Sequence, residues 1–385
     1  MINRNTKLVA IFVLVVLNLL VFIFKSNTIK TGEQVKVYKQ EKIKSKDKNK
    51  EQTKISKKIQ EERIIKLVSR NADFFFVSKI GNNLFYRDQD NSRFYRYDLN
   101  SKKESSISGP LPFVKDTIWS PDGSNAVFYV YQDNYFFKQY KDPFFDPNIE
   151  DGKHYYWIYN FNSKKLKRIG ENIYGITWTP DGKNIIYSYT KEFGGDTSQG
   201  IYVADSSFNN QRKISDLFFY EFSIAFLNNE EFLISKVLNE AGGTELYRIN
   251  YKLKKTDRVL SDIPICDFNL ISSDLVFLCL WDADSQEVSF KKLFLKDMSL
   301  EYLDENIASD AYIISDSGDY VLSIGINSDI DKYEIYKTNI WDGKKEKLKV
   351  SITYNKDVTL YIQLKNNTIY FISNGAVYMY SLPRG

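Results

Sequence analysis

The hexapeptide Ile-Trp-Ser-Pro-Asp-Gly at residues 118–123 is repeated almost unchanged as Thr-Trp-Thr-Pro-Asp-Gly at residues 177–182. Each copy is followed by a short run rich in aromatic and β-branched residues, 125–131 and 184–189. In such a turn Pro presets the backbone angle of the second position, Asp accepts local backbone hydrogen bonds and Gly adopts a left-handed conformation. The repeat therefore predicts two strands joined by a tight reversal. The Trp before each turn offers a large surface for packing between neighbouring units.

Less regular copies of this hairpin occur along the rest of the chain. Residues 314–320, Ile-Ser-Asp-Ser-Gly-Asp-Tyr, form a partial copy, and four further segments keep only the order strand, turn, strand. The seven turns fall near residues 81, 122, 181, 229, 273, 317 and 366, about 41 to 59 residues apart. This interval is expected of four-stranded propeller blades.

Each of the first six hairpins is followed by a second one, at residues 94–107, 155–169, 201–214, 246–260, 290–303 and 333–350. The seventh unit is followed only by residues 376–382, and residues 64–69 are a candidate for its missing outer strand. The sequence therefore predicts an all-β fold, a β-propeller of seven four-stranded blades. We expect the N-terminal strand to close the ring so that no sheet edge stays free. Six or eight blades are the alternatives, because four of the hairpins are degenerate.

The Trp-(Ser/Thr)-Pro-Asp-Gly units resemble the repeats of the WD-repeat-like, TolB-like β-propeller family. They are also similar to the propeller domains of prolyl oligopeptidases and dipeptidyl peptidase IV. The resemblance implies a propeller over residues 64–385, but no activity, because propellers host many functions. The added α/β domain of TolB is not evident here, and the Gly-x-Ser-x-Gly pentapeptide of the oligopeptidases does not occur in this sequence.

A membrane anchor is predicted within residues 1–25. Residues 8–24 are apolar apart from Asn18, and at about 1.5 Å per residue they just span a hydrocarbon core of about 30 Å. No small-residue cleavage site follows, so we expect an uncleaved signal anchor with a single transmembrane helix. The lysines after it count against export of the C-terminal part. Large domains behind an N-terminal signal are translocated largely regardless of charge, so we expect the propeller on the extracytoplasmic side of the cell membrane.

Residues 26–63 are predicted to be a Lys-rich flexible stalk that leads to the propeller domain, residues 64–385. Residues 25–63 contain 13 Lys or Arg and 6 Asp or Glu, which leaves about −5 for the propeller out of a net +4 for the chain. Such a polar segment cannot bury enough apolar surface to offset the cost of ordering it. A solvated spacer is the favoured interpretation, and contact with anionic lipid or wall polymer is the alternative. The basic residues belong to this segment, so the sequence indicates no nucleic-acid partner.

The composition argues against the common catalytic and metal centres, and we predict no catalytic, cofactor-binding or metal-binding residues. His154 is the only histidine, which argues against Ser-His-Asp and Cys-His catalysis and against multi-histidine metal sites. Glu150 and Asp151 lie near it in the sequence and suggest an acid–base pair, but an ordinary surface histidine is the favoured interpretation.

Two sets of acidic residues are explained by their local structure. The turn aspartates Asp122, Asp181 and Asp316 suggest a ring of carboxylates, yet their role in the turns already accounts for them. Residues 190–200 contain Glu192 and Asp196 around two glycines, but the spacing defines no calcium site, and a solvated loop is the favoured interpretation.

The two cysteines, Cys266 and Cys279, lie on either side of a predicted turn near residue 273. Two cysteines in a chain of this length do not make a disulfide framework. The sequence therefore favours two buried free thiols, and a disulfide across the hairpin is the alternative.

The longest interruption of the repeat, residues 132–153, is the candidate partner-binding segment. Loops on a rigid scaffold are where binding residues concentrate, and aromatic side chains are enriched at interfaces. The candidate residues are Tyr135, Phe136, Phe137, Tyr140, Phe144 and Phe145. The alternative is that these aromatic residues fold back over the blade as a local core.

These features predict a non-catalytic, membrane-anchored propeller that acts as a protein-interaction or scaffold module, with a protein partner. The alternative is a propeller enzyme or carbohydrate-binding module with its site at the central opening. Carboxylate-only glycosidase chemistry needs no histidine and stays within that alternative.

Overall fold

The structure is a computed structural model that describes most of the predicted propeller. The described residues are 64–131, 133, 138, 143–144, 153–170, 172–190, 198–236, 244–282, 287–304, 311–315, 317–327, 332–353, 362–373 and 375–382. The chain divides into two compact units, Met1–Ile59 and Gln60–Gly385, and all described residues belong to the second. The predicted transmembrane helix and stalk lie outside them. Within the described ranges, no helix has the length and apolar character needed to cross a bilayer.

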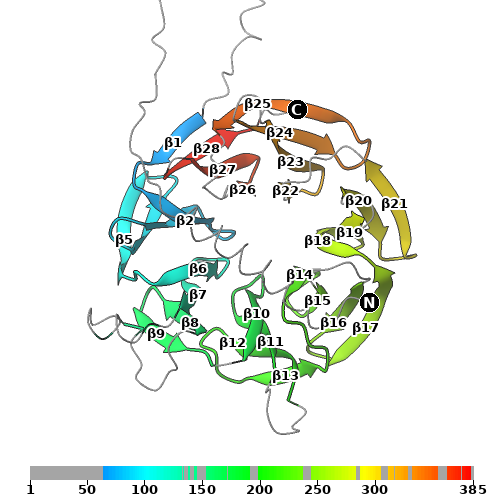
Figure 1. The fold of residues 1–385 in the computed structure, drawn as a ribbon, viewed down its shortest axis with the longest axis horizontal. Coiled ribbons are helices and arrows are strands. Elements are labelled where there is room, and N and C mark those ends of the chain that lie inside the picture. Colours follow the sequence, from blue (N-terminus) through cyan, green and yellow to red (C-terminus); the bar gives the residue numbers. More distant parts are fainter. Residues whose placement is uncertain are drawn as a thin grey trace, which may run out of the picture. The chain divides into compact units, whose positions relative to one another are not determined.

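The described residues form seven antiparallel sheets of four strands each, placed as blades around a central opening (Figure 1). This confirms the predicted all-β propeller and its seven four-stranded blades. From the innermost strand outward, blades 1 to 4 are β2 (Ala72–Val77), β3 (Asn83–Asp88), β4 (Arg93–Asp98), β5 (Lys103–Pro110); β6 (Val114–Trp119), β7 (Asn125–Tyr131), β8 (His154–Asn160), β9 (Lys165–Arg168); β10 (Ile173–Trp178), β11 (Asn184–Tyr189), β12 (Gly200–Asp205), β13 (Arg212–Ser215); and β14 (Phe222–Phe226), β15 (Glu231–Lys236), β16 (Thr244–Asn250), β17 (Lys255–Ile263). Blades 5 to 7 are β18 (Ile265–Ser272), β19 (Leu275–Asp282), β20 (Glu287–Phe294), β21 (Ser299–Asp304); β22 (Ala311–Ile314), β23 (Tyr320–Asn327), β24 (Lys332–Asn339), β25 (Lys345–Thr353); and β26 (Ile362–Lys365), β27 (Thr368–Ser373), β28 (Ala376–Ser381), β1 (Ile64–Val68).

The repeated turns have the geometry that their residues predict. The amide of Gly123 donates to the carbonyl of Ser120 at 2.8 Å, and Gly182 and Gly318 make the equivalent bonds in their own blades. All three glycines have φ near +70°. At Gly123 a side chain is also excluded sterically, because a Cβ atom would lie 2.2 Å from the ring of Phe85 in the neighbouring blade.

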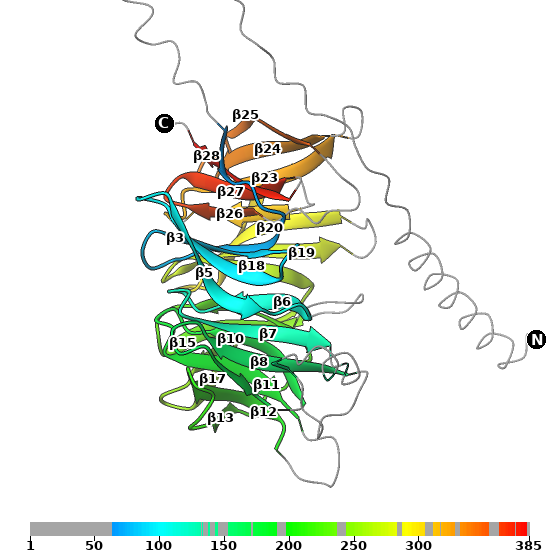
Figure 2. The ribbon, with the colours of Figure 1, turned by 90° about the vertical axis from the view of Figure 1, so that its left-hand side faces the viewer.

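The antiparallel order gives the ring two unlike ends. Successive strands alternate in direction, so the turns between first and second strands all lie at one end, which we call the turn end. The connections between second and third strands, and the links between blades, lie at the opposite end, the loop end. The longest connections, residues 132–153 and 190–199, both leave from the loop end. The strands run through the thickness of the ring between the two ends (Figure 2).

The hydrophobic core lies between blades, as the turn tryptophans predict. Trp119 is buried and stacks on Phe76 of blade 1 at 5.9 Å and on Phe161 of its own blade at 4.9 Å. Trp178 is likewise buried, and its indole Nε1–H donates to the carbonyl of Ile118 in blade 2 at 3.0 Å. The repeated Trp therefore joins each of these blades to the one before it.

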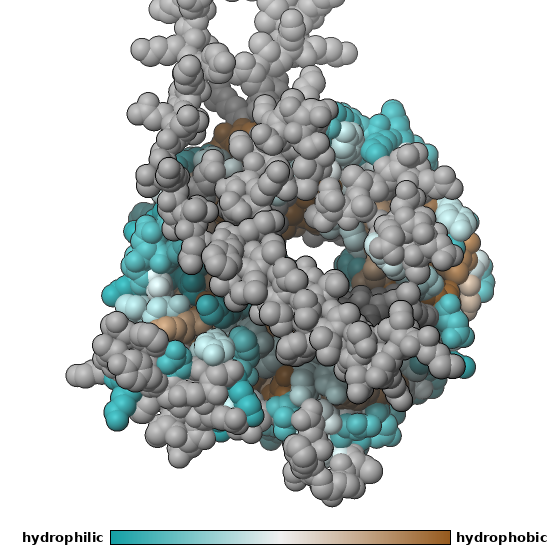
Figure 3. All heavy atoms as spheres, in the orientation of Figure 1, coloured by the Kyte–Doolittle hydropathy of each residue, from teal (hydrophilic) through white to brown (hydrophobic). Residues whose placement is uncertain are grey.

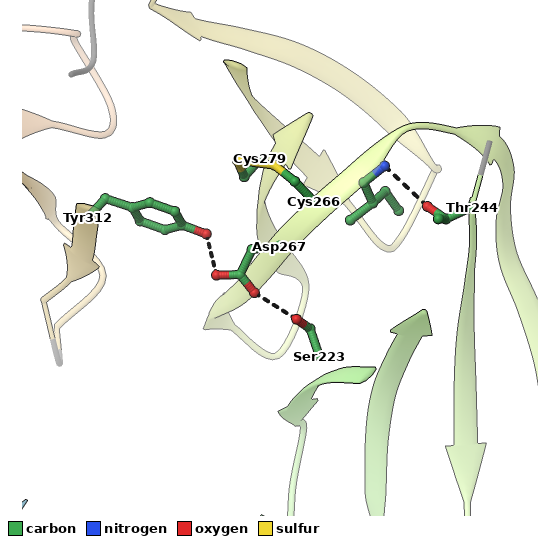
Figure 4. Close-up of a disulfide and its surroundings, with 7 residues drawn as sticks. Ser223, Thr244, Cys266, Asp267, Cys279 and Tyr312 are labelled. Atoms are coloured by element: carbon green, nitrogen blue, oxygen red, sulfur yellow. Dashed lines mark hydrogen bonds between the residues drawn. A yellow bond between two sulfur atoms is a disulfide. The ribbon is translucent and has the colours of Figure 1, made fainter. Parts of the chain in front are cut away.

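Polar bonds between innermost strands add to this packing. Asp267 on β18 accepts a hydrogen bond from the Ser223 hydroxyl of blade 4 at 3.0 Å and another from the Tyr312 hydroxyl of blade 6 at 2.7 Å (Figure 4). Burial, followed by the nearby Asp267, raises the pKa of Tyr312 far above its usual range, so its hydroxyl stays protonated as a donor. Asp267 thus links three consecutive blades.

The cysteines next to this link form a disulfide, so the expectation of two free thiols is wrong. Cys266 and Cys279 are bonded, with their Cα atoms 5.5 Å apart (Figure 4). The pairing of β18 with β19 shifts register between Ile265 and Asp267, which leaves Cys266 as an extra, bulged residue opposite Cys279. A bulge redirects a side chain, and here it places the two sulfur atoms within bonding distance. The sequence indicates the hairpin but not the bulge.

The seventh blade combines both ends of the described chain. β1 lies beside β28 as the outermost strand, with Ile64 opposite Tyr380 and Lys66 opposite Tyr378. Val68 at its end is buried against Ala72 and Val377.

Candidate functional site

A cavity of about 880 Å³ opens toward the loop end where blades 2, 3 and 4 meet. Its walls come from β7 and β8 of blade 2, β10 of blade 3, and the link from β13 to β14 of blade 4. β10 and β14 are innermost strands, so the cavity lies next to the central opening, which is visible in the space-filling view (Figure 3). A concave site of this size is the default place to expect ligand binding.

The blade 2 wall is a cross-strand row of aromatic side chains. Tyr129 is paired with Asp116 on one side and with Tyr156 on the other, and Tyr131 is paired with His154. Residues directly opposite one another in a sheet point to the same face. Tyr129 stacks on His154 at 4.7 Å and lies 5.1 Å from Tyr156. The row is therefore continuous and faces blade 3.

The opposite wall depends on a glycine in β10. The register of β10 with β11 shifts between Tyr174 and Ile176, so Gly175 is a bulged residue, and its φ is +53°. A Cβ atom at Gly175 would lie 2.5 Å from the ring of Phe222 in blade 4. Tyr174 meets the exposed Tyr220 edge to face at 5.0 Å. The glycine thus makes room for an aromatic pair and for Phe222 at the junction of blades 3 and 4.

The charged groups near the cavity are exposed, whereas the aromatic groups are half-buried and neutral. Burial raises the pKa of Tyr156 to about 12, with smaller contributions from Tyr129, Asp116 and Glu221. Burial lowers the pKa of His154, and the charge of Lys115 lowers it further. Near neutral pH both side chains are therefore uncharged.

This arrangement is suited to binding rather than to proton transfer. A general acid or base works best with a pKa near the operating pH, and the tyrosine shifts move away from it. In the described part of the chain, His154 has no hydrogen bond to a carboxylate, and Glu150 and Asp151 lie outside that part. Nor does any group of three or more His, Cys, Asp or Glu among the described residues gather as metal ligands do.

The residues predicted from the sequence lie elsewhere or outside the described residues. Phe144 is fully buried and packs edge to face on Trp157 at 5.5 Å and on Phe128 at 6.3 Å, as the local-core alternative predicts for it. The other five candidates, Tyr135, Phe136, Phe137, Tyr140 and Phe145, lie outside the described residues, as do Glu192, Asp196 and Asp316.

The turn aspartates have structural partners. The Ser120 hydroxyl donates to Asp122 at 2.7 Å, and the Thr179 hydroxyl donates to Asp181 at 2.8 Å. Burial alone would raise the pKa of Asp122, but hydrogen bonds from Ser120 and Ser124 hold it below its usual value. Both carboxylates lie at the turn end, away from the cavity.

Sequence reasoning missed the aromatic residues of the cavity. The alternation of Tyr129 with Tyr131, and of His154 with Tyr156, marks one face of a hairpin. Gly175 inside a strand is a recognised sign of a bulge or a close approach. These signals were available, but the meeting of three blades at one place depends on packing that a single chain pattern does not contain.

The architecture is similar to several solved propellers. A prolyl endopeptidase structure matches with a TM-score of 0.52 and 12% identity, covering 83% of this chain and 51% of that one. The β-propeller domain of Cps50 (Swd1) from Myceliophteria thermophila matches with a TM-score of 0.51 and 11% identity, covering 83% of this chain and 100% of that one. TolB from Acinetobacter baumannii matches with a TM-score of 0.42 and 10% identity, covering 70% and 64%.

These likenesses confirm the resemblance to TolB-like and prolyl oligopeptidase propellers. At such low identities they show the fold alone, and this chain spans about half of the prolyl endopeptidase. No protein-family profile matches the sequence, and no curated protein matches it.

Proposed function

We propose that this chain is a non-catalytic propeller that binds a protein partner at its loop end. The observation that carries the proposal is the aromatic cavity between blades 2, 3 and 4. Tyr220 is 58% exposed there, and exposed tyrosines beside a concave apolar surface are typical of interfaces. A rigid ring that presents such a surface suits a scaffold role.

In this proposal residues 8–24 anchor the chain in the membrane, the propeller lies on the extracytoplasmic side, and β1 closes the ring. The disulfide between Cys266 and Cys279 supports that location, because disulfides persist in oxidising compartments and are rare in the cytosol. The position of β1 beside β28 supports the closure.

A carbohydrate-binding module is the second candidate. The half-buried aromatic faces of the cavity and its position next to the central opening favour it, because sugar rings present apolar faces that pack on aromatic rings. Turnover of a glycoside or lactone by the purified protein would contradict the non-catalytic part of the proposal.

Site-specific photo-crosslinking tests the protein-binding proposal. A photoreactive phenylalanine analogue replaces Tyr220 in the full chain, within cells that produce it. The matched control carries the same analogue at Tyr302, an equally accessible tyrosine (68% exposed) on the outer strand β21. We expect a discrete protein adduct from position 220 and none from position 302. Equal adducts from both positions, or none from either, would contradict partner binding at the loop end.

A further inference from the structure

Two carboxylates beside the cavity lack an ionic partner. Glu221 lines the cavity, and among the described residues it forms neither a hydrogen bond nor an ion pair. Asp116 lies next to Tyr129 and accepts only the backbone amide of Thr117, at 2.7 Å. Other acidic residues of the propeller are paired, for example Glu231 with Arg248. Two unpaired carboxylates at one hollow therefore call for a ligand group of opposite charge.

The two carboxylates converge on the aromatic part of the cavity. They come from different blades, Asp116 from β6 and Glu221 from the link that precedes β14. Both raise the pKa of Tyr156, so both lie within electrostatic reach of its hydroxyl group. A cation that entered beside Tyr156 would meet aromatic faces and two negative charges together.

The positive charges lie toward a different part of the cavity. Lys153 lines it next to His154, and Lys115 lies close enough to His154 to lower its pKa. His154 itself is neutral near pH 7. The basic groups therefore gather at the His154 side and the carboxylates act at Tyr156, which gives the cavity an electrostatic polarity.

We propose that, within the protein-binding role proposed above, the cavity admits a lysine or arginine side chain of the partner. The ammonium or guanidinium group would lie against the tyrosine rings, which attract cations through their electron-rich faces. Its aliphatic stem would pack on Ile118 and Ile176 of the cavity lining. A purely apolar side chain would partly desolvate the carboxylates without compensating them, and an acidic one would be repelled.

Short peptides with one variable position test this inference on the purified full chain. The probes are acetyl-Gly-Lys-Gly-amide, its arginine counterpart and acetyl-Gly-norleucine-Gly-amide, which has a similar apolar stem and no charge. Binding is measured by saturation-transfer NMR, with a trisaccharide of N-acetylglucosamine as a further probe. We expect the basic peptides to bind about fivefold or more tightly than the norleucine peptide, as a cation–π contact implies. In Asp116→Asn and Glu221→Gln this preference falls, whereas Asp216→Asn keeps it. Asp216 is a suitable control because it lies in the same link as Glu221, is 96% exposed and is paired with Lys213.

Each outcome separates this inference from the proposed function. Equal binding of the norleucine and basic peptides overturns cation recognition and leaves protein binding in place. Failure of every probe overturns the inference, while the adduct at position 220 still decides the proposed function. Binding of the trisaccharide alone, lost in Tyr156→Ala, overturns both. A preference that survives both carboxylate substitutions also overturns the inference.

Discussion

At the scale of single residues, the Asp of each repeated turn holds the turn closed. Asp122 accepts the Ser120 hydroxyl at 2.7 Å and the Ser124 amide at 3.0 Å. We expect Asp122→Ala to lower the free energy of unfolding by about 1 kcal/mol, the usual contribution of such bonds. Asp122→Asn keeps one acceptor oxygen and should lose less. Chemical denaturation of the three proteins measures the difference.

The same substitution has a pH signature. The pKa of Asp122 is lowered in the folded protein, so its contribution is present above the unfolded-state value of about 3.9 and is lost as pH falls through the folded value. The stability gap between the native protein and Asp122→Ala should therefore shrink below about pH 4. A gap that stays constant down to pH 2 would show that the charge of Asp122 has no part in it.

The residue scale also shows what the sequence could and could not reveal. The roles of Asp122 and Gly123 follow from turn chemistry, which depends on only four neighbouring residues. The meeting of Gly175 with Phe222 joins strands from two blades and depends on a positive φ and on the packing between them. Local chemistry was therefore predictable, whereas the residues of the cavity were not.

At the scale of elements, the disulfide in blade 5 holds together the hairpin that carries Asp267. Cys266 and Cys279 are 13 residues apart, and closing a loop of that size stabilises a protein by roughly 2–4 kcal/mol. We expect a reducing agent to lower the stability of the native protein by this amount. It should leave the double variant Cys266→Ala/Cys279→Ala unchanged. A native protein whose denaturation midpoint does not respond to reduction would argue against the bond.

Elements were the most predictable level of this structure, and their irregularities the least. The spacing of turns placed the hairpins of all seven blades, because a strand of alternating residues and a turn leave local patterns. The bulges at Cys266 and Gly175 leave almost none, since a shift of one residue is set by the partner strand. The expectation of free thiols failed at one of these bulges.

At the scale of the whole molecule, the ring depends on the outermost strand of its seventh blade. We expect a chain that starts at residue 70, and so lacks β1, to be less stable than one that starts at residue 61. The burial of Val68 alone is worth about 2 kcal/mol. The loss of β1 also leaves β28 as an unpaired edge, which should promote aggregation. Thermal unfolding and light scattering compare the two chains, and equal behaviour would mean that β1 adds nothing to closure.

The unequal ends of the ring give it a division of labour. Short reversals that each need their own Pro, Asp or Gly fix the strands at the turn end, so a change of length there would disturb the packing of adjacent blades. The connections at the loop end carry no such requirement, and exposed loops of this kind tolerate insertion and exchange. A propeller built in this way can acquire new specificity at one end while its frame stays constant, and foreign recognition segments should be graftable there without loss of the fold.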